Sequence, residues 1–125
     1  MTLVDSVGWI EFFIDGPLAG SYAKHLEKPS ELVIPTIVLY EVYKKIKRDR
    51  SEEQALVAVT TMQDARILPL TEALSLAAAD MSLKYKLAMA DAVVYATAVR
   101  ENARLITSDK DLKDLPQVTY YPKKS

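Results

Sequence analysis

The sequence contains no cysteine, only one histidine, His25, and three glycines among its 125 residues. Without cysteine the chain can form no disulfide, no thiolate zinc site and no cysteine nucleophile. One histidine is too few for a histidine-rich zinc or iron site, and we expect His25 to be a surface residue rather than a catalytic base. The glycine-rich phosphate loops and the nucleophilic serine elbow are also absent. Only oxygen ligands remain for a metal site.

The chain also has little net charge and no long apolar run. Its formal net charge of −1 gives no overall attraction for a polyanion. No stretch reaches about 18 apolar residues and no basic segment precedes the apolar start, so we expect neither a membrane span nor a signal peptide, and a cytoplasmic protein. A hydrophobic content of 50% in 125 residues predicts one compact domain over residues 1–125.

Short strand-like runs alternate with helical stretches along the chain. The expected strands are residues 3–4, 32–34, 66–70, 104–107 and 118–120. The expected helices are residues 6–14, 18–27, 36–48 and 51–64, then one that starts at Thr71 and ends before Lys84, followed by one that runs through Asp91 to Asn102. Thr36 and Ser51 are candidate N-caps. The alternation predicts an α/β fold with a central, mostly parallel five-stranded sheet and helices on both faces.

Four carboxylates stand in or directly after apolar runs. Asp91 is the only charged residue between Leu87 and Val99. A buried carboxylate is costly unless a cation or several hydrogen-bond donors meet it. The four acidic residues in such surroundings are Asp5, Glu41, Asp91 and Asp109. Because carboxylate oxygens suit hard divalent ions, the pattern indicates one site for Mg²⁺ or Mn²⁺.

The expected topology brings these residues together. Ligands of open parallel sheets bind beyond the carboxyl ends of the strands, and Asp5 and Asp109 both follow strands. If the first and fourth strands are neighbours, these two carboxylates come close, with Glu41 and Asp91 facing them from helices.

Each acid also has an alternative, purely structural interpretation. Asp5 and Asp91 could cap helices, and Asp109 could be a turn or cap residue. Glu41 could lie at the border of the buried stripe of its helix. Taken singly, the four residues leave both interpretations open.

Four segments together carry a family resemblance: Leu3-Val-Asp-Ser6, Pro35-Thr36…Tyr40-Glu41-Val42, Leu87-Ala-Met-Ala-Asp-Ala-Val-Val-Tyr-Ala-Thr-Ala98 and Leu105-Ile-Thr-Ser-Asp-Lys-Asp-Leu112. In their order and spacing they resemble the PIN-domain ribonucleases, and most closely the VapC-type toxins of VapBC toxin–antitoxin modules. The resemblance implies a three-layer PIN-like fold. It also implies the acidic quartet Asp5, Glu41, Asp91 and Asp109, supported by the hydroxyls of Ser6 and Thr107, with Asp111 able to share the fourth role.

What the resemblance implies for function is a Mg²⁺- or Mn²⁺-dependent endoribonuclease that leaves a 5′-phosphate and a 3′-hydroxyl. Its substrate would be structured RNA, such as tRNA or rRNA stem-loops. Its partners would be a VapB-type antitoxin, whose C-terminal segment covers the acidic cleft, and a second copy in a homodimer. Four aromatic side chains are candidates for such contacts, the first three of which also fit a core: Trp9, Phe12, Phe13 and Tyr22. Two positions depart from the commoner pattern, Leu112 in place of an aromatic residue and Gln117 in place of glycine.

A nuclease also needs local positive charge. Residues 44–50 contain five basic side chains in seven positions, beginning one turn after Glu41. The candidate RNA contacts are Lys44, Lys45, Lys47 and Lys110. A solvated helix end explains the same residues, because cations suit the C-terminal end of a helix.

Two other function classes fit parts of the sequence. A phospho-acceptor receiver domain has this length, but it requires an acidic pair after the first strand, where only Asp5 stands, and an acceptor aspartate after the third strand, which ends in Leu68-Pro-Leu70. A non-catalytic RNA- or protein-binding module would keep the fold without turnover.

Overall fold

The structure is a computed structural model that describes residues 1–123. Its strands are β1 (Thr2–Val4), β2 (Val33–Pro35), β3 (Arg66–Leu68), β4 (Arg104–Thr107) and β5 (Val118–Tyr120). Its α-helices are α1 (Ser6–Ile14), α2 (Ala19–Ala23), α3 (Thr36–Asp49), α4 (Glu52–Met62), α5 (Glu72–Tyr85) and α6 (Met89–Arg100), and the 3₁₀ helices are η1 (Pro29–Glu31) and η2 (Lys110–Leu112). None of the described helices has both the length and the apolar content needed to cross a membrane.

All strand pairs are parallel, as the alternation of strands and helices predicted. Strand β4 pairs with β1 on one side and β5 on the other, and β2 pairs with β3. A single parallel bridge between Thr2 and Leu32 links the two groups. The predicted five-stranded sheet is therefore only partly correct, because strands of three or four residues leave few positions for a continuous ladder between β1 and β2.

This order also separates the fold from a receiver domain. Receiver domains have the order 2-1-3-4-5, in which the first strand lies beside the third. Here β1 lies beside β4, and β3 pairs with β2. The receiver alternative is therefore wrong.

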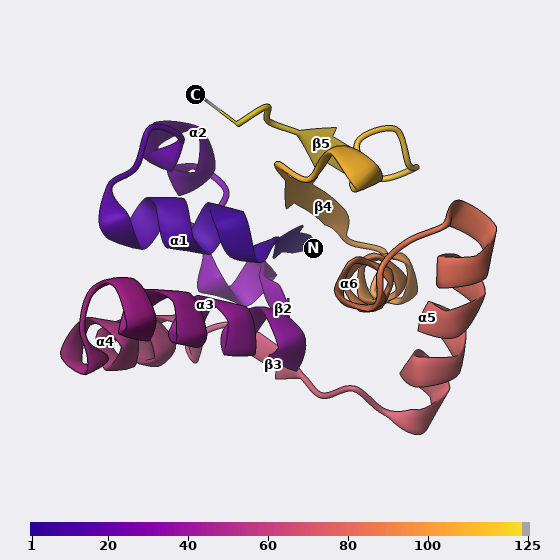
Figure 1. Ribbon diagram of the computed structural model, residues 1–125, viewed down its shortest axis with the longest axis horizontal. Coiled ribbons are helices and arrows are strands. Elements are labelled where there is room, and N and C mark those ends of the chain that lie inside the picture. The colour runs from indigo at the N-terminus through magenta and orange to yellow at the C-terminus, as the bar shows by residue number, and fades with distance from the viewer. Residues whose placement is uncertain (124–125) are drawn as a thin grey trace.

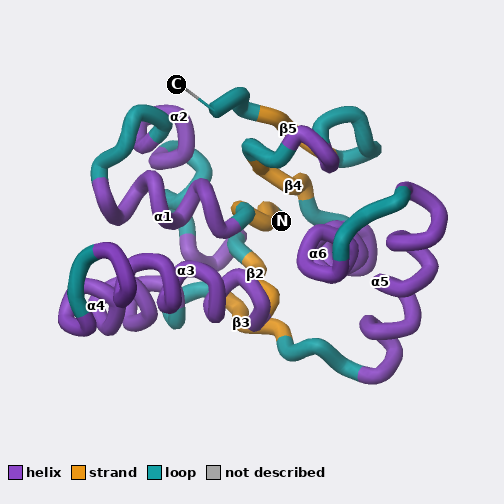
Figure 2. The backbone as a smooth tube through the Cα atoms, viewed as in Figure 1, coloured by secondary structure: helices purple, strands orange, loops and turns teal. Residues whose placement is uncertain are grey.

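The helices form two groups around the strands (Figure 1). Helices α1 to α4 lie together on one side, with α3 packed on α4 and α1 on both α2 and α3. Helices α5 and α6 pack on each other on the other side. The strands run between these groups, as the backbone trace shows (Figure 2). The predicted layering, with helices on both faces of parallel strands, is confirmed.

The predicted helix starts are partly correct. Ser51 caps α4 by accepting a hydrogen bond from the Gln54 backbone N–H at 3.1 Å, as its position in the sequence predicted. Thr36 is not a cap: it is the first residue of α3, and the extended residue before it, Pro35, is the N-cap without a side-chain bond. The predicted helix over 18–27 shortens to Ala19–Ala23. The chain turns after it and reaches Lys28, which is extended because it precedes a proline.

Two of the aromatic residues considered for partner contacts belong to the core. Trp9 is 3% exposed and Tyr22 is fully buried, so neither offers a docking surface. Tyr22 lies against α1 at Gly8, where a Cβ atom would come within 2.4 Å of the Tyr22 ring. Phe12 is 39% exposed and Phe13 is partly buried against the core. The absence of a side chain at Gly8 thus allows α2 to approach α1, which the spacing of apolar residues could not reveal.

Candidate active site

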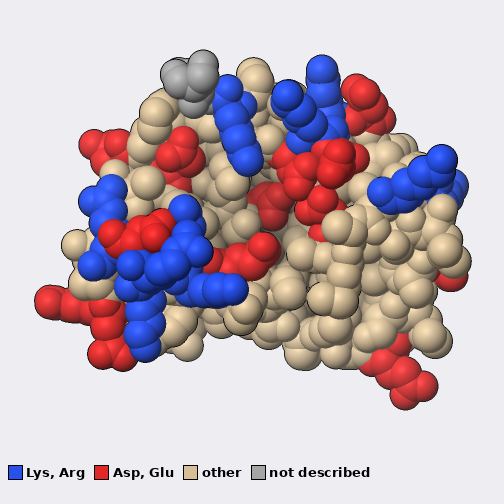
Figure 3. All heavy atoms as spheres, viewed as in Figure 1, with Lys and Arg blue, Asp and Glu red and all other residues tan. Residues whose placement is uncertain are grey.

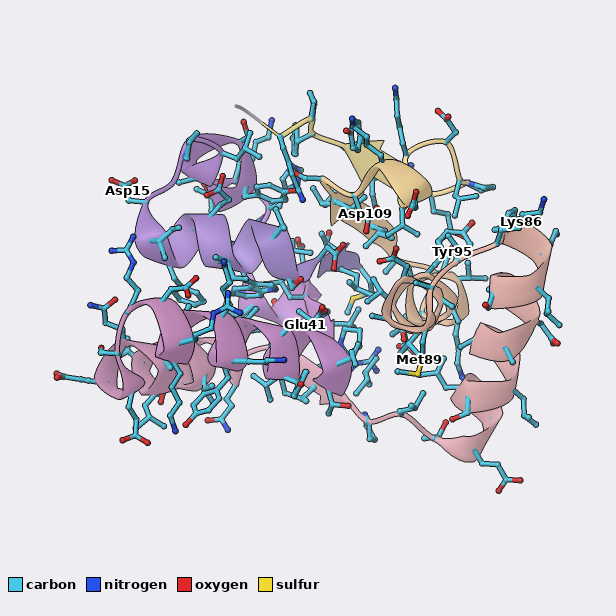
Figure 4. All side chains as sticks on the ribbon, in the orientation of Figure 1. Asp15, Glu41, Lys86, Met89, Tyr95 and Asp109 are labelled. Atoms are coloured by element: carbon cyan, nitrogen blue, oxygen red, sulfur yellow. The ribbon has the colours of Figure 1, made fainter. Side chains whose placement is uncertain are left out.

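The acidic residues meet at the carboxyl ends of β1 and β4. Asp5 directly follows β1, and Asp109 lies two residues beyond β4. Figure 3 shows acidic side chains gathered near the middle of one face, with basic side chains over α3 and α4 and over β5 on either side. Glu41 on α3 and Asp109 beyond β4 lie on facing elements of this region (Figure 4). The predicted meeting of residues far apart in the sequence is confirmed by the parallel β1–β4 pair.

Asp5 is held by hydrogen bonds at both carboxylate oxygens. Its Oδ1 accepts from the Ser6 backbone N–H at 2.8 Å, and its Oδ2 accepts from the Thr107 hydroxyl at 2.8 Å. Asp5 is 8% exposed, and its burial raises the pKa of the carboxyl against the opposing effect of these two hydrogen bonds. Asp5 is the N-cap of α1, as the structural alternative predicted, and it also lies near the other acids.

Thr107 connects Asp5 to the acidic turn after β4. Its Oγ1 donates to Asp5 and also accepts from the Asp109 backbone N–H at 3.0 Å. Asp109 Oδ1 in turn accepts from the Asp111 backbone N–H at 2.9 Å, which makes Asp109 the N-cap of η2. This chain of hydrogen bonds fixes where the Asp109 and Asp111 carboxylates lie relative to β1.

Three carboxylates form a cluster with the spacing of a metal site. One oxygen from each of Asp91, Asp109 and Asp111 lies within 4.8 Å of the other two. Burial raises the pKa of Asp91 to about 7, and a hydrogen bond with Asp109 and the negative charges of Asp109, Asp5 and Asp111 act in the same direction. Within residues 1–123, the ion pairs of the protein involve none of these three acids. Such a group of like charges is stabilised by a cation.

Glu41 faces the same site from α3. Burial raises the pKa of its carboxyl, and the negative charges of Asp5 and Asp109 raise it further. A hydrogen bond from the Ser6 side chain lowers this pKa in part. Ser6 therefore acts on both acids, because its backbone N–H donates to Asp5 and its side chain lowers the pKa of Glu41.

The structure brings together every acid that the sequence singled out. It also supports a role for Asp111, which the sequence left as an alternative to Asp109. Both residues contribute an oxygen to the cluster with Asp91. The carboxylate of Asp5 is instead occupied by two protein donors. Through its hydrogen bond from Thr107, Asp5 is linked to the turn that carries Asp109 and Asp111.

A buried pair beside the site was not anticipated from the sequence. The Tyr22 hydroxyl lies 2.6 Å from Ser108 Oγ, and both residues are buried. Burial raises the pKa of Tyr22 to about 12. No motif around Tyr22 signals this contact, because it depends on α2 reaching the segment that precedes Asp109.

The predicted RNA-binding lysines are all exposed, but they differ in their partners. Lys45 Nζ lies 2.8 Å from Asp49, and Lys47 Nζ lies 3.2 Å from Glu52. Lys44 Nζ instead lies 3.3 Å from the Tyr40 hydroxyl, and Lys110 begins η2 beside the acidic cluster.

Comparison with known proteins assigns the family. Over residues 2–118 the sequence matches the PIN domain. A search of the curated proteins finds no match to this sequence. Among solved structures, the chain is similar to a protein of a toxin–antitoxin complex from Klebsiella pneumoniae, with 25% identity and a TM-score of 0.82 over 98% of this chain and 100% of that one.

Two more distant structures share the fold. VapC20 of Mycobacterium tuberculosis, a toxin that cleaves the sarcin-ricin loop, has 17% identity and a TM-score of 0.72 over 83% of this chain and 85% of that one. A chain of VapBC2 from Rickettsia felis, in a complex with promoter DNA, has 18% identity and a TM-score of 0.75 over 97% of both chains. The resemblance inferred from the sequence is thereby confirmed, and the chain belongs to the PIN-domain family.

Proposed function

We propose that this protein is a divalent-metal-dependent endoribonuclease that cleaves structured RNA and acts as the toxin of a type II toxin–antitoxin pair. The observation that carries the proposal is the cluster of Asp91, Asp109 and Asp111, whose oxygens lie within 4.8 Å of one another beside Asp5 and Glu41. The similarity to a toxin that cleaves the sarcin-ricin loop supports RNA as the substrate.

The donors at this site fit Mg²⁺ or Mn²⁺. Every candidate ligand is a carboxylate oxygen, the donor that these hard ions prefer. Burial and the neighbouring negative charges raise the pKa of Asp91, and a bound cation would favour its charged form. When bound, such an ion supplies charge stabilisation for a phosphodiester and lowers the pKa of water.

Different residues of the chain would bind the metal ion, orient the water and bind the RNA phosphates. Asp91, Asp109 and Asp111 would hold the ion, and the Thr107 hydroxyl fixes the turn that carries the last two. Glu41, half-buried with a raised pKa, would orient the attacking water and accept its proton at a carboxylate oxygen. Lys44 and Lys110 would bind the flanking phosphates, because a chain of net charge −1 must attract RNA locally.

A cognate antitoxin and a homodimer belong to the same proposal. The antitoxin is supported by the similarity to chains from toxin–antitoxin and VapBC complexes. Light scattering of the purified chain measures its oligomeric state, and co-expression with its VapB-type partner tests suppression of cleavage.

The test is cleavage of structured RNA, including tRNA, by the antitoxin-free protein in Mg²⁺ or Mn²⁺. We expect defined products that EDTA and Asp91→Asn abolish. The matched control is Asp80→Asn, since Asp80 is an exposed acid on α5, outside the cluster. Binding of RNA without cleavage under all conditions would favour the non-catalytic module.

A further inference from the structure

An exposed tyrosine stands directly before Glu41. Tyr40 is 57% exposed on α3, although tyrosine rings usually bury most of their apolar surface. Its ring is met by Lys44, whose Nζ lies 5.5 Å from the ring centroid and 3.3 Å from the hydroxyl. An exposed aromatic ring and a cation are therefore presented together on α3, the helix that carries Glu41.

The neighbouring Tyr43–Lys47 pair has a different environment. Tyr43 is partly buried against the core, and Lys47 forms an ion pair with Glu52 at 3.2 Å. Within residues 1–123, Lys44 forms no ion pair with a carboxylate. Packing and charge pairing thus account for Tyr43 and Lys47, whereas the hydrogen bond and the cation–π contact found for Lys44 within residues 1–123 are both with Tyr40.

Helical spacing aligns the Tyr40–Lys44 pair with the site. Lys44 follows Glu41 by three positions, about one turn, so both lie on one side of α3. Tyr40 precedes Lys44 by four positions, so its exposed ring lies beside Lys44 on the same side of α3. A strand of RNA with a phosphate at the acidic cluster would thus meet Lys44 with a neighbouring phosphate and Tyr40 with a neighbouring base.

We propose that Tyr40 stacks on an unpaired base next to the cleaved phosphate, while Lys44 binds the backbone of the same strand. The proposal rests on the proposed ribonuclease function and makes Tyr40 a positioning residue that selects RNA with an unpaired nucleotide at that point. Stacking on aromatic rings is how proteins hold splayed single-stranded bases, whereas paired bases keep their faces covered.

The experiment measures RNA binding without cleavage. In a background of Asp91→Asn, where the RNA stays intact, a labelled hairpin RNA and its fully paired duplex counterpart are titrated with four further variants. Tyr40→Ala should weaken hairpin binding about 10- to 100-fold and duplex binding by less than about threefold. Tyr40→Phe, which keeps the ring, should bind the hairpin like its parent. Lys44→Gln should lower the slope of log K against log salt by about 0.7, the effect of one phosphate contact.

The matched control is Leu76→Ala, which removes another exposed apolar side chain, 65% exposed on α5. It should leave hairpin binding unchanged. Thermal melting of each variant checks that the fold is kept. Abasic substitution at one loop position should weaken binding to the parent as much as Tyr40→Ala does, and the two changes together should cause no further loss.

Hairpin binding by Tyr40→Ala equal to the parent, or an equal loss for duplex RNA, would overturn the stacking role. The nuclease proposal is tested apart from this, by cleavage with the unmutated chain. Cleavage with Tyr40-independent binding would overturn only the further inference. Tyr40-dependent binding without any cleavage would support the stacking and overturn the nuclease.

Discussion

Replacing Asp91 with asparagine should make the metal-free protein more stable while removing its response to metal. Burial, a hydrogen bond with Asp109 and the negative charges of Asp109, Asp5 and Asp111 raise the pKa of Asp91 from the ordinary 3.8 to about 7. The folded state then holds a proton that the unfolded state releases. The contribution of Asp91 to stability is therefore fully present below about pH 4 and is lost as the pH rises through about 7, because folding is opposed by the charge on Asp91.

The size of the effect follows from the pKa. A rise from 3.8 to about 7 corresponds to at most about 4 kcal/mol, at about 1.4 kcal/mol for each pH unit. Asp91 is only partly buried, so screening by solvent reduces this to about 1–2 kcal/mol. For a chain of 125 residues we therefore expect Asp91→Asn to raise the Tm in EDTA at pH 8 by about 3–8 °C.

Thermal melting from pH 4 to pH 8, with EDTA or with Mn²⁺, measures both effects. The unmutated protein should lose stability as the pH rises in EDTA and regain it with Mn²⁺, since a ligand of the folded state stabilises it. Asp91→Asn should flatten the pH dependence and reduce the gain from Mn²⁺. Asp80→Asn is the matched control. If Asp91→Asn melted below the unmutated protein at pH 8 in EDTA, the assignment of repulsion at this cluster would be refuted.

Three further groups of substitutions test the contacts that hold the site in place. Thr107→Val removes a hydroxyl that bonds on both sides, and it should lower the free energy of unfolding in urea by about 1–3 kcal/mol and slow RNA cleavage, whereas Thr107→Ser should change little. Tyr22→Phe and Ser108→Ala should each cost about 1 kcal/mol, and the double variant should lose less than their sum because the two share one hydrogen bond. Gly8→Ala should overpack the contact with Tyr22, lower the free energy of unfolding by about 1–3 kcal/mol and so lower the Tm. Gly20→Ala should leave the Tm unchanged, because nothing lies within 4 Å of the new Cβ.

The acidic site could be predicted because its residues interrupt apolar sequence. Asp91 is the only charged residue in an apolar helix, and Asp5 and Asp109 follow apolar strands, so the apolar residues around them marked them as candidates. The role of Asp111 could not be read in the same way. Its carboxylate joins the cluster only because η2 forms after Asp109, and that turn depends on a bond from its own backbone N–H.

What the sequence did not reveal depends on contacts between distant elements. Thr36 has the residue type of a cap, yet Pro35 occupies that position and leaves Thr36 inside the helix. Tyr22 lies in a polar stretch and is buried all the same, because Gly8 lets its ring approach α1. Strands β1 and β2 are linked by a single β-bridge. This depends on strand twist and length, which the pattern of hydrophobic residues does not encode.

The pairing of β1 with β4 means that the acidic site does not exist in any local segment of the chain. Asp5 and Asp109 are 104 positions apart in the sequence. A chain that ends before β4 lacks both the partner strand of β1 and two of the three clustered carboxylates. Both segments must therefore have been synthesised before the acidic site can assemble, and proteolytic loss of either segment would remove part of it.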